Sequence, residues 1–147
     1  MCRLLCTLVL SCVFLSASAQ FRSIPAEVTE GFDKKFPTAT HVIWKDRITT
    51  FQAEFQEEKQ KIKASFTTKG EWLKTEKIYD YTKLPAEVKD GFAKSKYATY
   101  KVREVSEVND SEKGLQYLVV VKKGDLTKRN LYFTESGQLV KDDVNFY

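Results

Sequence analysis

The nine residues IPAEVTEGF, at positions 24–32, recur as LPAEVKDGF at positions 84–92. Six of the nine positions are identical, and the offset between the two copies is 60. A segment that recurs at a fixed distance in a chain of 147 residues indicates an internal duplication, in which each copy builds the same structural unit. This duplication decides the fold that we expect.

A second pair of similar segments closes each copy. FTTKGEWLK at 66–74 corresponds to FTESGQLVK at 133–141, now at an offset of 67. The second copy has therefore gained about seven residues, which we place in the turn-rich segment 109–114 (NDSEKG). We divide the chain after residue 19 into repeat 1, residues 20–82, and repeat 2, residues 83–147.

Each repeat is predicted to open with a helix. In repeat 1 the apolar residues Ile24, Val28 and Phe32 are four positions apart, which makes one stripe along a helix. Leu84, Val88 and Phe92 repeat the pattern. We expect Pro25 and Pro85 at the first helical position, and we expect a close packing contact at Gly31 and Gly91.

After the first helix the apolar period changes to two, which is typical of strands. With residues 58 and 59 at the tip of a hairpin, Phe55 faces Ile62 on one side of the sheet and Glu54 faces Lys63 on the other. The same register places Ala53 opposite Ala64, Phe51 opposite Phe66, and Gln56 opposite Lys61. Because the tip lacks glycine, a longer loop in the same register stays open as an alternative.

The remaining predicted strands complete an α+β fold. They are His41–Lys45, Trp72–Tyr79, Lys101–Val108, Gln116–Lys122, Leu126–Thr134 and Gln138–Phe146. Each repeat is therefore a helix followed by a four-stranded antiparallel meander. Two copies give about eight strands with two helices on one face. One copy of about 60 residues would be only marginally stable alone, so we expect the two sheets to join or to pack into one unit with one shared core.

Residues 1–19 are typical of a secretory signal peptide, with Arg3 before a twelve-residue apolar stretch and small residues before Gln20. The apolar stretch is too short to cross a bilayer, which disfavours an uncleaved anchor. A lipoprotein anchored at Cys12 is the alternative, but it leaves a short apolar region and has the bulky Leu10 where a small residue is expected. We therefore expect a periplasmic or secreted protein.

Composition excludes several classes of function. The three cysteines are Cys2, Cys6 and Cys12, and the only methionine is Met1, so the chain after residue 19 contains no sulfur. A thiolate nucleophile, a cysteine metal site and a disulfide framework are thereby excluded. The net charge of +4 is too small to indicate nucleic-acid binding.

No catalytic or metal-binding constellation is visible in the sequence. His41 is the only histidine, so a three-histidine metal site cannot form, and no matching nucleophile constellation accompanies this histidine in the sequence. Asp142 and Asp143 are adjacent on a predicted strand and point to opposite faces, which prevents them from sharing an ion. Turn chemistry explains the polar segment 109–112. We expect no enzyme activity, no cofactor and no metal.

A binding surface is the better expectation, because the apolar residues of the second meander cannot all face the helices. If Tyr117, Val119 and Val121 face the helices with Leu131 and Phe133, then the opposite, open face of the sheet carries other apolar side chains. The residues that we expect there are Leu118, Val120 and Tyr132, joined by Trp44 and Trp72. Aromatic anchors are typical of protein interfaces. The alternatives are a sheet covered on both faces and a reversed strand phase.

The duplicated PAEVxxGF helix, the closing FTxxGx(W/L)xK segment and the signal peptide together resemble the PepSY-like family of beta-lactamase-inhibitor-like exported bacterial proteins. The resemblance covers residues 20–147. It implies a duplicated helix-plus-meander unit whose sheet has an open face opposite the helices. In the inhibitor fold that face holds an enzyme, and PepSY domains are proposed to restrain peptidases. The chain departs from the inhibitor by lacking cysteines after residue 19, and we find no inhibitory loop to carry over.

We therefore expect an exported, non-enzymatic binding protein that uses the open face of its sheet, in particular as an inhibitor of a peptidase or another hydrolase. Its partner would be another protein and not nucleic acid. The mature chain would have no membrane span and would be monomeric. The alternative function is an envelope sensor for a small ligand or ion, built on the carboxylates and the groove between the repeats.

Overall fold

The computed structural model describes residues 23–124 and 127–145, and it contains the helix-plus-meander unit twice. The predicted signal segment, residues 1–19, lies outside the described residues. The first unit consists of α1 (Ala26–Lys35), β1 (Thr40–Arg47), β2 (Thr50–Glu57), β3 (Gln60–Thr67) and β4 (Trp72–Tyr79). A short 3-10 helix, η1 (Tyr81–Lys83), leads to the second unit: α2 (Ala86–Lys94), β5 (Lys101–Asp110), β6 (Gly114–Lys123), β7 (Thr127–Phe133) and β8 (Leu139–Asn145).

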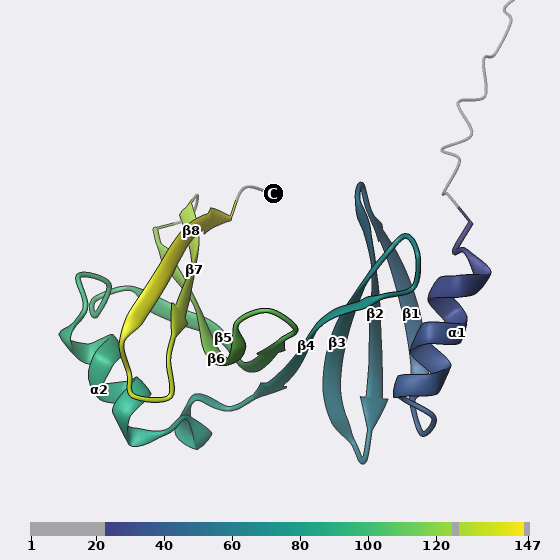
Figure 1. The fold of residues 1–147 in the computed structure, drawn as a ribbon. Helices are drawn as coiled ribbons and strands as arrows, with labels where there is room; N and C mark the ends of the chain where they lie inside the picture. The colour runs from purple at the N-terminus through teal and green to yellow at the C-terminus, as the bar shows by residue number, and fades with distance from the viewer. Residues whose placement is uncertain (1–22, 125–126, 146–147) are drawn as a thin grey trace, which may run out of the picture.

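The eight strands form one sheet in the order of the sequence, and every neighbouring pair is antiparallel. The two meanders join at β4 and β5, where Ile78 pairs with Ser106. Figure 1 shows the sheet curving between α1 and α2, which lie on opposite outer flanks of the molecule. The predicted α+β class and the joined eight-stranded sheet are confirmed.

Each helix begins one residue later than expected. Pro25 and Pro85 are the N-cap residues, with ψ values of 149° and 148°, and are not the first helical residues. The N-cap position suits proline. The carbonyl of Pro25 accepts hydrogen bonds from the amides of Val28 and Thr29, and a residue at this position needs no N–H group of its own, which proline lacks.

The glycines of the repeated motif allow each helix to touch the turn that closes its own meander. A Cβ atom added to Gly31 would lie 2.4 Å from the carbonyl oxygen of Gly70, and one added to Gly91 would lie 1.9 Å from that of Gly137. Gly70 and Gly137 themselves have φ of +80° and +81°. The predicted close contact is confirmed, and it explains why both recurring segments contain glycine.

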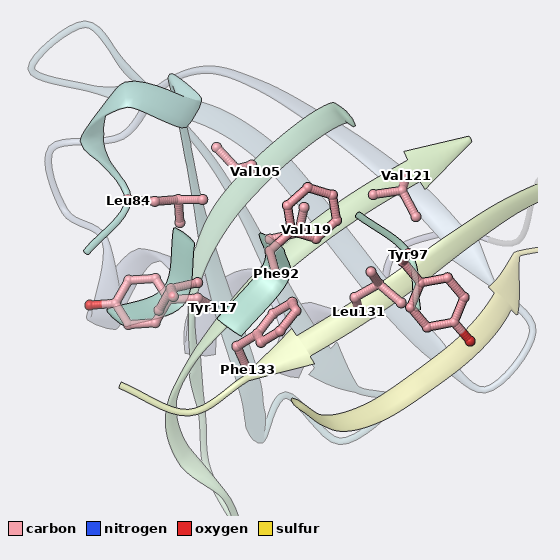
Figure 2. Close-up of a cluster of buried hydrophobic side chains, with 10 residues drawn as sticks. Leu84, Phe92, Tyr97, Val105, Tyr117, Val119, Val121, Leu131 and Phe133 are labelled. Atoms are coloured by element: carbon pink, nitrogen blue, oxygen red, sulfur yellow. The ribbon is translucent and has the colours of Figure 1, made fainter. Parts of the chain in front are cut away.

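The expectation of one shared core is wrong, because the buried apolar residues form two clusters, one under each helix. The cluster under α1 is aromatic, with the Phe32 ring 5.0 Å from that of Phe55 and 5.2 Å from that of Trp44. The cluster under α2 is richer in aliphatic residues, and Figure 2 shows Phe92 among Val119, Leu131 and Phe133. The curvature of the sheet separates the two helices, so each one covers its own half.

The hairpin register predicted for repeat 1 is confirmed. Phe55 pairs with Ile62 and Glu54 with Lys63. The turn at Glu58 and Lys59 has only these two residues, with φ values of 48° and 68°, which is the geometry of a type I′ turn. In repeat 2 the inserted residues lengthen β5 and β6 to ten residues each.

Candidate functional site

The side of the sheet that faces away from the helices forms a concave surface. Strand alternation assigns its residues, because Val119 and Leu131 are fully buried under α2 and their strand neighbours point the other way. Leu118 and Tyr132 are cross-strand partners on this opposite face. The two predicted sets of residues on β6 and β7 therefore lie on the faces that we expected.

A groove of about 470 Å³ occupies this concave surface, and residues from seven of the eight strands line it. The lining residues are Lys45, Arg47, Gln52, Glu54, Lys63, Lys74, Glu76, Arg103, Glu104, Leu118, Val120, Lys128, Asn130 and Tyr132. Residues from β1 and β7 can line one groove because the sheet is strongly curved. We refer to these fourteen residues as the concave face.

Of the apolar residues predicted for this site, Leu118, Val120 and Tyr132 lie on the concave face. Leu118 is only 4% exposed, so Val120 and Tyr132 offer more of the accessible surface. Their position is established, whereas their role in partner binding stays a prediction.

The expectation that Trp44 and Trp72 share this face is wrong, because both pack against the core under α1. Trp44 pairs with Ala53, which is fully buried on the helix side. Between Trp72 and Lys74 the register shifts, so the two residues point to opposite faces although they are two positions apart. The Trp72 indole instead donates a hydrogen bond to Thr75, at 2.9 Å.

Three ion pairs organise the charges of the concave face. Lys45 lies 2.7 Å from Glu54 across β1 and β2, and Lys74 lies 2.5 Å from Glu76 along β4. The third pair joins the repeats, since Lys63 on β3 reaches Glu104 on β5 at 3.0 Å. Each glutamate of the groove therefore already has a lysine partner.

The Lys74–Glu76 pair is the most buried of the three. Burial acts to lower the pKa of the Lys74 ammonium, but the charge and hydrogen bond of Glu76 outweigh it, so the pKa of Lys74 is raised. Nearby, burial raises the pKa of the Tyr132 phenol. At neutral pH this part of the groove presents a lysine ammonium, a carboxylate and a neutral phenol, which suits hydrogen bonding to a polar ligand.

The groove is charged, which was not expected, because only apolar residues were predicted to line the open face of the sheet. Six of the fourteen lining residues are basic and three are acidic. Arg47 donates a hydrogen bond to Gln52 at 3.2 Å, and it adds to the positive excess. The sequence does contain a feature that predicts a charged face. The register that places Glu54 opposite Lys63 also defines the polar side of the sheet.

The residues considered for catalysis and cation binding do not assemble into a site. His41 is exposed, with φ of +54°, at an irregularity of the edge strand β1. Asp142 accepts a hydrogen bond from the Tyr97 hydroxyl and pairs with Arg129 at 2.9 Å, whereas Asp143 pairs with Lys141 at 2.5 Å. Within residues 23–124 and 127–145, no group of three or more His, Cys, Asp or Glu side chains is placed to hold a metal ion.

Comparison with known protein families defines the class of protein. Residues 49–141, well over half of the chain, match the family described as "Putative beta-lactamase-inhibitor-like, PepSY-like". The chain belongs to this family. No curated protein matches it in sequence.

Solved structures show the same fold. A BLIP-like protein from Bacteroides fragilis is 24% identical, with a TM-score of 0.72, over 87% of this chain and 91% of that one. A DUF2874 family protein from Bacteroides ovatus is 23% identical, with a TM-score of 0.74, over 86% and 92% of the two chains. A protein described as "putative periplasmic", from Bacteroides eggerthii, is 23% identical, with a TM-score of 0.73, over 84% and 90%.

The helices of the described residues do not cross a membrane, since none is both long and apolar enough. The longest of them, α1, has ten residues.

Proposed function

We propose that this chain is an exported, non-enzymatic binding protein that holds another protein against its concave face, and that it restrains a peptidase or another hydrolase. The groove carries the proposal, because it extends across seven strands and combines Val120 and Tyr132 with charged side chains. Apolar anchors surrounded by polar groups are typical of protein interfaces. Membership of a family named for its likeness to a beta-lactamase inhibitor supports the proposal, and the signal-like residues 1–19 support export to the periplasm or beyond.

Affinity capture with matched variants tests the proposal. The bait is the chain from residue 20, as wild type, V120Q or Y132S, and the control bait is I48Q, which replaces an apolar residue that is 92% exposed in the β1–β2 turn. We expect one envelope protein to be recovered by wild type and I48Q and to be lost from V120Q and Y132S. Trp44 is unsuitable for this test, because its substitution would disturb the core.

The recovered protein is then assayed as a hydrolase with and without the wild-type chain. Saturable inhibition at equimolar ratio would support restraint of an enzyme. Recovery of the same proteins by all four baits would overturn the use of the concave face. Stabilisation of the isolated chain by calcium or a small peptide, with no protein recovered, would favour a ligand sensor instead, since a bound ligand raises the melting temperature by mass action.

A further inference from the structure

The sheet has two open edges. Among the described residues, β1 is paired only with β2 and β8 only with β7, so the outer side of each of these strands faces no other strand. Four of the six exposed large apolar residues lie on these two strands: Val42, Ile43, Val140 and Val144. An edge strand with exposed apolar side chains is a template for pairing with a further strand.

The duplication shows which kind of strand each edge is suited to meet. β8 is the last strand of repeat 2 as β4 is the last strand of repeat 1, and β1 is the first strand of repeat 1 as β5 is the first strand of repeat 2. β4 and β5 pair with each other in the middle of the sheet. The outer edge of β8 therefore corresponds to the edge of β4 that faces β5, and the outer edge of β1 corresponds to the edge of β5 that faces β4.

The strand registers establish which residues of the two repeats correspond. Lys74 of β4 corresponds to Lys141 of β8, at an offset of 67, because both lie beside the same shift of register against the preceding strand. Trp44 of β1 corresponds to Val105 of β5, at an offset of 61, because both lie one position after the residue at which the register with the next strand resumes. The junction inside the sheet can therefore be translated residue by residue onto the two open edges.

This translation places opposite charges across the contact. At the β4–β5 junction Glu76 pairs with Val108, and the corresponding residues at the open edges are Asp143 and Arg47. Both lie on the same side of the sheet, since Arg47 lines the groove and Asp143 is the cross-strand partner of Asn130, which also lines it. Opposite charges that are directly across from each other stabilise a pair of strands.

The contacts that these residues make within their own chain are compatible with the pairing. Arg47 donates a hydrogen bond to Gln52 at 3.2 Å, and Asp143 pairs with Lys141 at 2.5 Å. A guanidinium group donates several hydrogen bonds and a carboxylate accepts several, so each can hold a second partner. The irregularity of β1 does not prevent the pairing either, because β5 has the equivalent register shift and still pairs with β4 beyond it.

We propose that β8 of one copy of this chain pairs antiparallel with β1 of a second copy, in the register of the β4–β5 junction, so that copies assemble head to tail. The inference is independent of the proposed function, because it concerns the edges of the sheet and another copy as their occupant. It differs from the expectation of a monomeric chain. A head-to-tail contact forms a ring where the rotation between copies closes, and an open filament where it does not.

Sedimentation velocity of the chain from residue 20, over a range of concentrations, tests the assembly. We expect species larger than one chain, whose share rises with concentration. R47D and D143R should each weaken association about fivefold or more, because an attraction becomes a repulsion, and the double variant R47D/D143R should restore it. The control K34D makes the same change of charge as R47D at an exposed position of α1 and should associate like wild type.

Introduced cysteines test the register, because the chain after residue 19 has no cysteine of its own. Residues directly opposite in antiparallel strands have Cα atoms about 4.5–5.5 Å apart, which a disulfide can span. Under mild oxidation we expect a mixture of R47C and D143C to form a linked pair. We expect no linked pair from either variant alone or from K34C mixed with D143C.

Several results would overturn the proposal. They are a monomer at every concentration, equal association of wild type and R47D, and no linked pair from R47C with D143C. Linkage of D143C to itself would indicate that β8 pairs with β8 and would also contradict the head-to-tail contact. Circular dichroism melting separates lost association from unfolding, and if R47D or D143R fails to fold, the cysteine mixtures decide.

Discussion

At the scale of single residues, the fold depends on places where a side chain is missing. Gly91 lets the backbone of α2 reach the carbonyl of Gly137, and Gly31 does the same for α1 and Gly70. The atoms that an added Cβ would meet belong to backbone, which cannot rotate away as a flexible side chain can.

Gly91→Ala therefore tests this contact, because the contact determines whether the substitution raises or lowers the free energy of unfolding. In an exposed helix the change from glycine to alanine stabilises by about 0.5–1 kcal/mol, whereas here overpacking should destabilise by about 1–3 kcal/mol. Urea denaturation measures the free energy of unfolding. Ala93→Gly at the exposed neighbouring position is the control, with a loss of only about 0.5–1 kcal/mol. A more stable G91A protein would show that the helix does not touch the turn.

Asp142 gives a pH-dependent prediction. The hydrogen bond from Tyr97, followed by Lys96 and Arg129, lowers the pKa of its carboxyl below 3.8. A carboxyl with a lowered pKa in the folded state stabilises the protein at higher pH, and this stabilisation is lost as pH falls through the folded pKa. We expect D142N to melt at a lower temperature than wild type at pH 7.

That difference should narrow only below about pH 3.8. D143N, whose partner Lys141 is exposed, serves as the control and should change the melting temperature less at every pH. A constant difference between wild type and D142N from pH 7 to pH 2.5 would contradict the role given to the Asp142 carboxylate.

At the scale of elements, cross-strand complementarity determines how much of the strand register could be predicted from the sequence. The β2–β3 register followed from the sequence because apolar pairs on one face and a charge pair on the other required the same alignment. Trp72 was assigned to the wrong face because a register shift between β3 and β4 breaks the alternation beside it. Bulges of this kind depend on the geometry of the neighbouring strand, which composition and periodicity do not contain.

The β2–β3 turn makes a testable prediction about local conformation. Glu58 and Lys59 both have positive φ, which costs about 1–2 kcal/mol for each residue that is not glycine. Asn-Gly is the preferred pair in a type I′ turn. E58N/K59G should therefore raise the free energy of unfolding by about 1 kcal/mol.

The matched control for this turn is T68N/K69G, which places the same residues in the β3–β4 turn, where neither position has positive φ. We expect it to be neutral or destabilising, since glycine there only increases the entropy of the unfolded chain. Equal gains in the two double variants would contradict the type I′ geometry.

At the scale of the whole molecule, one sheet connects two separate cores, each of which belongs to a half of marginal size for independent folding. The sequence could predict the duplication and the joined sheet, but not the division of the core, because the curvature of a sheet arises from its twist and bulges over many strands. The same curvature brings charges from β1 to β7 into one groove, which is why the candidate site was only partly visible in the sequence.

The two halves should unfold together. Both tryptophans belong to repeat 1, so their fluorescence reports on that half, while Leu131 is fully buried in the core of repeat 2. Leu131→Ala should cost about 2–5 kcal/mol and should shift the tryptophan transition by the same amount as the circular dichroism transition. A tryptophan transition that stays at the wild-type denaturant concentration would show that the repeats unfold independently.

The central claim is that the concave face is where this protein meets its partner, and photo-crosslinking in the cell tests it most directly. A benzophenone amino acid is placed at Val120 or Asn130 in the groove, and at Lys34 on the outer face of α1 as the control. The account predicts one adduct of the same mass from both groove positions and no adduct from the control. Adducts of equal yield at all three positions, or an adduct from Lys34 alone, would contradict it.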